Sequence, residues 1–323
     1  MQGSMIHRAE QFTENRKRIE RAFRLSTPQT HCLCALLLGL DDRDADLLMI
    51  RRGKKTLRRS TRLFSAFRGL AKAPAAVKLG EYEDGEQRFV YCRDNLRRLK
   101  AAGFAPTDYL VPASFLMAKG HDRADRIAGD AFAHYREMQH AHRVLTGGED
   151  VLYAVLFAMY GLNPQDVTAR TNAAMDVLSA RFHCGNPTQM ASFAIAAASG
   201  DAAETAQRTE RLYDAVRNAG VKNRETLDVP LLAFLAALNV PEEETAQTIA
   251  SVNAYLKSRR GFSIARVGRS QRLFYATALT AIDALFKAPL SDDERAKLRD
   301  LLQALMLSGI LLFIVAAMSA AQE

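Results

Sequence analysis

The chain has 323 residues, of which 48% are hydrophobic and 25% charged, and its formal net charge at pH 7 is +8. That composition is ordinary for a folded protein and excludes an intrinsically disordered chain. The four cysteines, Cys32, Cys34, Cys92 and Cys184, are too few for a disulfide framework in a chain of this length, and no secretory leader precedes them. We therefore expect a protein of the reducing cytoplasm.

Residues 1–4 stand before a second methionine and are interpreted as a remnant of cloning. From residue 5 onward, apolar side chains recur at the three- and four-residue steps of helices. Helices are predicted over residues 6–25, 30–40, 45–59, 72–79, 86–102, 108–119, 122–145, 151–160, 167–182, 189–199, 229–238, 242–259, 271–286 and 291–323, and another from Asp201.

Several of these helices carry end signals. Gly103 is expected to end the helix over 86–102. The pairs Asn163-Pro164 and Asn186-Pro187 each predict an N-cap followed by a first-turn proline. Ser291, three residues before Glu294, predicts a capping box at the start of the last helix.

The apolar segments recur along the chain. They open near Asp108, Glu149, Asn186, Leu227 and Arg269, at spacings of 41, 37, 41 and 42 residues, and most precede a more charged helix. Such a recurrence is typical of helical-repeat proteins. We predict an all-α fold: a solenoid-like array of helical hairpins with a period of about 37–42 residues. It would form one domain over residues 5–323 and end in a long apolar helix over 291–323.

Short segments carry a resemblance to a family. They are Leu63-Phe-Ser-Ala-Phe-Arg-Gly69, Asp108-Tyr-Leu-Val-Pro-Ala113, Leu145-Thr-Gly-Gly-Glu-Asp150, Gly185-Asn186 and the small-residue C-terminal tail. In order and spacing they resemble the uncharacterised bacterial family called domain of unknown function four-thousand-and-three, over nearly the whole chain. The resemblance implies an intracellular, all-helical protein. It supplies no activity, cofactor or site.

The common catalytic and phosphate-binding motifs are missing. The sequence has no GxGxxG, GxxxxGK[ST], GxSxG or HExxH. Thr146-Gly-Gly-Glu-Asp150 is interpreted as a turn with acidic first-turn residues, because those acids would occupy the place of a bound anion. Cys32 and Cys34 point to opposite sides of a helix and are interpreted as core residues rather than metal ligands. No cofactor is expected.

One group of side chains is a weak candidate for a metal site. His134, Glu137 and His140 lie on the predicted helix over 122–145, and the last two have the i, i+3 spacing of di-iron bundles. Those bundles need a second such motif, which this sequence lacks. His134 also falls on the apolar stripe, so a hydrogen-bonded core histidine is the favoured interpretation.

The positive charge gathers in two islands. Residues 51–72 contain nine Lys and Arg and no acid, and residues 257–272 contain six and no acid. Within them the candidate residues for binding a polyanion or a partner are Arg51, Arg52, Lys54, Lys55, Arg58, Arg59, Arg62, Arg68, Arg259, Arg260, Arg266 and Arg269. Phe64 and Phe67 offer stacking surfaces for bases in one interpretation of the first island. In the other, both rings turn into the core and the island is a solvated helix face.

The function these features favour is non-catalytic binding of a protein segment in the concave groove of the array, with the basic islands giving charge selectivity. Two other classes remain open: a metal-dependent enzyme built on His134, Glu137 and His140, and a membrane-associated protein. The membrane alternative rests on residues 301–321, which carry no charge and are long enough to cross a bilayer. The same segment could instead pack inside the fold or form an oligomer contact.

Overall fold

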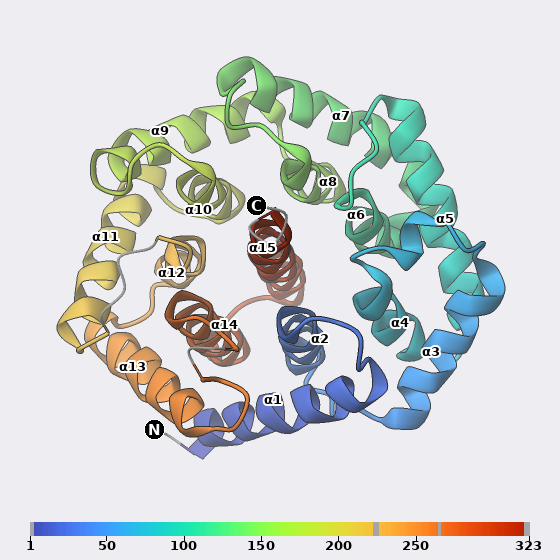
Figure 1. The fold of residues 1–323 in the computed structure, drawn as a ribbon. Coiled ribbons are helices and arrows are strands. Elements are labelled where there is room, and N and C mark those ends of the chain that lie inside the picture. Colours follow the sequence, from blue (N-terminus) through green and yellow to red (C-terminus); the bar gives the residue numbers. More distant parts are fainter. Residues whose placement is uncertain (1–2, 222–225, 264–265, 320–323) are drawn as a thin grey trace. The chain divides into compact units, whose positions relative to one another are not determined.

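The computed structural model describes residues 3–221, 226–263 and 266–319. Over these ranges the regular elements are all helices, so the prediction of an all-α fold is confirmed (Figure 1). The α-helices are α1 (Gly3–Ala22), α2 (Pro28–Leu40), α3 (Leu47–Ser60), α4 (Lys72–Gly80), α5 (Gly85–Ala102), α6 (Leu110–Met117), α7 (Ala124–Ala141), α8 (Val151–Met159), α9 (Pro164–Phe182), α10 (Asn186–Ala197), α11 (Ala202–Asn218), α12 (Val229–Ala237), α13 (Glu242–Ser258), α14 (Arg269–Lys287) and α15 (Asp292–Ser319). Three short 3₁₀ helices lie between them: η1 (Ala66–Arg68), η2 (Ala118–Arg123) and η3 (Gly148–Asp150).

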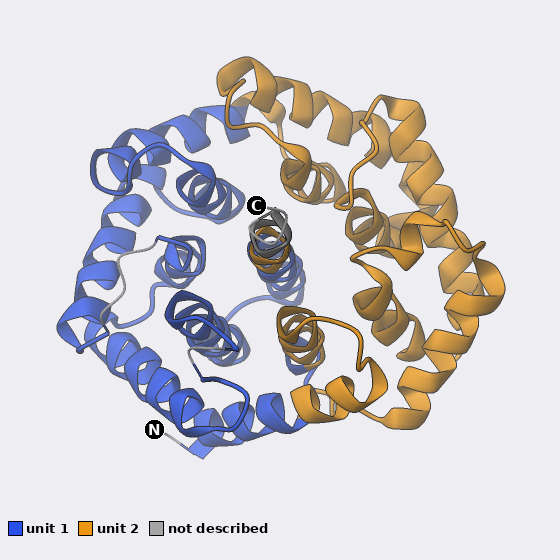
Figure 2. Cartoon of the chain, viewed as in Figure 1, with its two compact units in different colours: residues 1–14, 39–42, 166–309 blue, residues 15–38, 43–165, 310–323 orange. Residues whose placement is uncertain are grey.

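The chain divides into two compact units (Figure 2). Unit 1 comprises residues 1–14, 39–42 and 166–309, and unit 2 comprises residues 15–38, 43–165 and 310–323. The single domain over 5–323 stays a prediction. Of the four residues interpreted as a cloning remnant, Gly3 and Ser4 already belong to α1.

Within each unit, consecutive helices up to α14 alternate between two layers (Figure 1). In unit 1, α10 contacts α12 and α12 contacts α14, while α11 contacts α13; α11 also packs on α12, and α13 on α14. In unit 2, α3 packs on α4, α5 on α6 and α7 on α8, and contacts join α3 to α5, α5 to α7 and α6 to α8. The apolar helices are buried as expected: every residue of α8 from Val151 to Ala158 is buried.

A close approach of two helices in unit 2 depends on two glycines. A Cβ added at Gly53 of α3 would lie 1.8 Å from the carbonyl oxygen of Ala76, and one added at Gly80 would lie 2.3 Å from that of Met49. Neither place holds a side chain, so the backbones of α3 and α4 touch directly. This contact brings the basic helix α3 against α4.

Most helix ends agree with the predictions. Gly103 ends α5 with a left-handed φ of +117°, and Ser291 forms the predicted capping box with Glu294. Asn163 caps α9 by accepting from the Gln165 N–H at 2.9 Å. The second Asn-Pro pair was interpreted wrongly, since Gly185 is the N-cap and Asn186 is already helical.

Two predicted helices are too long. The helix over 122–145 ends at Ala141, because the N–H and the Oγ1 of Thr146 both donate to the carbonyl oxygen of His142 and close a turn. The helix over 108–119 begins only at Leu110, and η2 follows it with a kink at Gly120.

The last helix, α15, extends to Ser319, and residues 320–323 of its predicted range lie outside the described residues. The expectation of an apolar helix over 291–323 is not confirmed in that form, because residues 292–300 carry seven charges. Residues 301–314 are buried except for the half-buried Leu312. In unit 1, a Cβ added at Gly309 would lie 2.6 Å from the Phe274 ring, so α15 packs closely on α14. Among the described helices, none combines the length and apolar character that a membrane crossing needs.

Candidate partner-binding site

A groove of about 400 Å³ in unit 2 collects most of the first basic island. Six of its lining residues are cations and three are apolar, and none is an acid. The cations are Arg51, Lys54, Lys55, Arg58, Arg68 and Lys72, and the apolar residues are Phe23, Leu57 and Ala76. Like charges held together around an apolar floor give the groove a positive potential.

The pattern of α3 explains why its charges gather there. Met49, Ile50, Gly53, Thr56 and Leu57 form the buried side of the helix, and all of its arginines and lysines stand at exposed positions. Asp46 caps the helix by accepting from the N–H groups of Leu48 and Met49. The helix dipole favours the basic residues of the last turn.

Two of the six cations are held by bonds to the backbone. Lys54 Nζ donates to the carbonyl oxygen of Ala22 at 2.7 Å and lies 4.8 Å from the centre of the Phe23 ring. Arg68 Nη2 donates to the carbonyl oxygens of Arg58 and Thr61, both at 3.0 Å. The walls of the groove are thus fixed in part by the charged side chains themselves.

Three predicted members of the first island do not line the groove. Arg52 Nη2 donates to the carbonyl oxygen of Gly80 on α4 and helps to join the two helices. Arg59 and Arg62 are exposed on the end of α3 and just after it. Four lining residues are not among the predicted candidates: Phe23, Leu57, Lys72 and Ala76. Lys72 could have been found, because it is the last cation of the acid-free run, whereas no local signal joins Phe23 to residues some thirty positions later.

The two phenylalanines of the first island behave differently. Phe67 turns into the core, where it packs edge-on against Phe89 with ring centres 5.0 Å apart. Phe64 is exposed. The core interpretation is therefore confirmed for Phe67, whereas a stacking role for the exposed Phe64 stays a prediction.

The second island lies in unit 1. Arg259, Arg260, Arg266 and Arg269 are all exposed, and they are not among the residues that line the basic groove. Arg259 lies 4.2 Å from the centre of the Tyr255 ring. Part of the predicted basic loop, residues 264–265, lies outside the described residues.

The weak metal candidate is not assembled into a ligand group. His134 is buried and its Nε2 lies 3.0 Å from the carbonyl oxygen of Leu162, as expected for a hydrogen-bonded core histidine. Burial lowers its pKa. Glu137 is half-buried and His140 exposed. In the described part of the chain no three His, Cys, Asp or Glu side chains are placed to hold a metal ion.

The Thr146-Gly-Gly-Glu-Asp150 segment forms the predicted turn with acidic residues. Asp150 Oδ2 accepts from the Gly147 N–H at 2.9 Å, and Asp150 and Glu149 are both buried. Burial raises the pKa of Asp150 well above its ordinary value, and the neighbouring Glu149 adds to the rise. The Gly147 N–H, which could otherwise donate to a bound anion, already donates to the Asp150 carboxyl.

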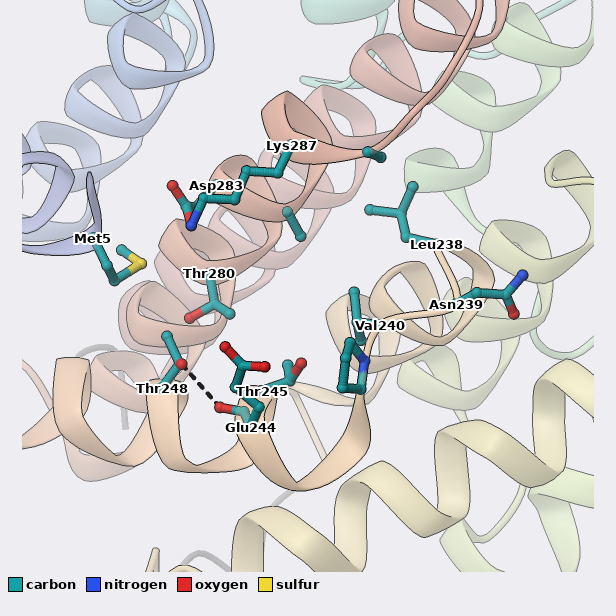
Figure 3. Close-up of a pocket in the computed structure, with 13 residues that line it drawn as sticks. Met5, Leu238, Asn239, Val240, Glu244, Thr245, Thr248, Thr280, Asp283 and Lys287 are labelled. Atoms are coloured by element: carbon teal, nitrogen blue, oxygen red, sulfur yellow. Dashed lines mark hydrogen bonds and ion pairs between the residues drawn. The ribbon is translucent and has the colours of Figure 1, made fainter. Parts of the chain in front are cut away.

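A second hollow, of about 250 Å³, lies in unit 1 between α13, α14 and the segment after α12 (Figure 3). Its charges are largely satisfied within the protein. Asp283 accepts from Lys287 Nζ at 2.7 Å and from Arg8 Nε at 3.1 Å, and Thr248 Oγ1 donates to the carbonyl oxygen of Glu244. Opposite charges in one small hollow largely cancel, so the basic groove is the stronger candidate for binding a charged partner.

Residues 15–318 match a family model described as "Protein of unknown function (DUF4003)". Comparisons with curated proteins and with solved structures find no match. The matched range contains the whole basic groove, every α-helix from α2 to α14 and nearly all of α15. Because the match covers far more than half of the sequence, the chain belongs to the DUF4003 family of proteins of unknown function.

Proposed function

We propose that this chain is a non-catalytic binding protein that holds an acidic segment of a partner protein in the basic groove. The observation that carries the proposal is the groove lining: six cations and no acid around Phe23, Leu57 and Ala76. Carboxylates or phosphates of a segment would meet the cations, and its aliphatic side-chain stems would cover the apolar floor.

A protein segment suits the groove better than a nucleic acid. Non-specific binding of single strands combines a basic surface with open aromatic faces for the bases. Here Lys54 lies over the ring of Phe23, and Phe67 is in the core. The lining therefore offers charge and a small apolar floor, and Phe64 outside it is a single exposed ring rather than a row of stacking faces for successive bases.

The predicted array of helical hairpins is part of this proposal. Its support is the packing within each unit, where consecutive helices up to α14 alternate between two layers as they do in repeat proteins. We place the protein in the cytoplasm, which is supported by four free thiols.

The test is fluorescence anisotropy with a labelled peptide of alternating aspartate and glutamate. The triple variant Arg51→Gln, Lys55→Gln, Arg58→Gln removes three lining charges and leaves the bonds of Lys54 and Arg68 in place. We expect affinity to fall roughly tenfold, since exposed ion pairs contribute up to about 1 kcal/mol each.

The matched control is Arg259→Gln, Arg266→Gln, Arg269→Gln, which removes the same charge from exposed sites in unit 1. Its affinity should stay close to that of the wild type. Equal losses in the two triple variants would mean that net charge alone attracts the peptide, and the groove would then not be the site.

A further inference from the structure

The loop that follows α3 exposes two large apolar side chains. Leu63 is 71% exposed and Phe64 is 96% exposed, although Phe67, a few residues later, is only 2% exposed. The core thus accepts one phenylalanine of this short segment and leaves the other in water. Adjacent exposed apolar residues of this size point to a contact with another molecule.

The exposed pair is presented by a loop with fixed ends. Arg68 Nε donates to Thr61 Oγ1 at 2.7 Å, and Arg68 Nη2 donates to the carbonyl oxygens of Thr61 and Arg58. The Ser65 N–H donates to the carbonyl oxygen of Arg62 and closes a turn around Leu63 and Phe64. Because Arg58 and Arg68 both line the groove, the loop that carries the exposed pair begins and ends at groove residues.

We propose that Leu63 and Phe64 are the second half of the binding site and contact a bulky apolar side chain of the same segment whose acids occupy the groove. This inference rests on the proposed function. It narrows the partner to a protein segment that combines clustered acidic residues with an adjacent leucine, isoleucine or phenylalanine.

Charge complementarity and shape favour this occupant over an anionic membrane surface. The apolar residues Phe23, Leu57 and Ala76 lie inside a concave hollow, where a narrow chain segment can reach them. A planar layer of lipid headgroups would touch only the rim and leave that floor in water. A segment can contact the floor and the exposed pair together.

The experiment uses the full chain and two synthetic acidic peptides. One peptide carries a leucine-phenylalanine pair among aspartates and glutamates, and a small set of such peptides places the pair at each position in turn. The other peptide carries serines at the same positions. The wild type should bind the best apolar peptide about tenfold more tightly than its serine form, because burial of one large side chain supports a factor of this size.

The variant Leu63→Ser, Phe64→Ser should bind the two peptides equally, with its affinity for the serine peptide unchanged. Val144→Ser, at another exposed apolar residue of unit 2, is the control and should keep the wild-type preference. Both changes lie on the surface, and circular dichroism will check that each variant keeps its helical content.

The possible failures are distinguishable. Equal binding of both peptides by the wild type in every register would overturn the role of Leu63 and Phe64 while the groove proposal stands. Binding of neither peptide would overturn the proposed function itself. Binding to vesicles of phosphatidylserine and phosphatidylcholine that depends on Leu63 and Phe64, without any preference between peptides, would assign the surface to a membrane and refute the inference.

Discussion

Arg68 and Arg58, both in the wall of the basic groove, are joined by a hydrogen bond of 3.0 Å from Arg68 Nη2 to the carbonyl oxygen of Arg58. The bond satisfies a carbonyl at the end of α3, where the helix itself supplies no partner. The side chains of both arginines line the same groove, whose lining contains no acid. One arginine therefore ends a helix, closes a loop and contributes charge to the groove.

Arg68→Gln should loosen the loop over residues 61–68. We expect the free energy of unfolding to fall by about 1–3 kcal/mol, because several bonds to Arg58 and Thr61 are lost together. Urea unfolding followed by circular dichroism measures the change. Arg62→Gln, in the same loop and exposed, should have an effect within about 0.5 kcal/mol. A variant at Arg68 as stable as the wild type would show that the loop is held by other contacts.

The direct backbone contact of α3 and α4 predicts a second effect on stability. Gly53→Ala would place a methyl group 1.8 Å from the carbonyl oxygen of Ala76, so the helices must move apart. We expect a loss of at least about 1–3 kcal/mol and a lower melting temperature. Gly129→Ala, in the middle of α7 with nothing near its Cβ, should instead stabilise by about 1 kcal/mol. Equal melting temperatures of the two variants would contradict the close approach of α3 and α4.

The helices and their approximate ends could be predicted from the sequence, because apolar periodicity and capping residues are local signals. The end of α7 at Ala141 was missed, since the apolar stripe continues through Leu145 while the backbone turns at His142. The site was predicted in part. Arg51 and Arg58 belong to an acid-free run, but Phe23 joins them only through tertiary packing, and the difference between Phe64 and Phe67 depends on which of them reaches Phe89.

Asp150 predicts a dependence of stability on pH. Burial raises its pKa in the folded protein above the ordinary value of 3.8, so its contribution is fully present below that value and is lost as pH rises through the folded pKa. Asp150→Asn cannot lose a proton at this position. The wild type should therefore lose stability relative to the variant as pH rises above about 4, by about 1.4 kcal/mol for each unit by which the pKa is raised. Urea unfolding of both proteins from pH 4 to 8 measures the difference, and parallel curves would contradict the raised pKa.

The basic groove also predicts salt-dependent binding of a simple polyanion. At low salt the wild type should bind heparin weakly, and affinity should fall steeply with added salt because bound counterions are released. Changing Arg51, Arg52, Lys54 and Lys55 together to Gln should flatten the plot of log affinity against log salt, which isothermal titration at several salt concentrations can measure. Were the wild type not to bind heparin at low salt, the island would be an ordinary solvated face.

The burial of α15 predicts that the chain depends on its last helix. Residues 301–314 are buried except for Leu312, and Gly309 lies directly against Phe274 of α14. A chain that ends at Asp300 would leave the apolar surface of α14 uncovered, so it should melt lower or aggregate, whereas the full chain should be recovered without detergent.

Leu305→Asn tests the same contact in the full chain, and we expect it to cost about 2–5 kcal/mol, as removal of a buried leucine does. Leu48→Asn, at an exposed leucine, should be nearly neutral. Thermal melting of the four proteins compares these outcomes. Recovery of the full chain only from the membrane fraction, with the shortened chain stable in buffer, would show instead that the 301–321 segment serves as an anchor.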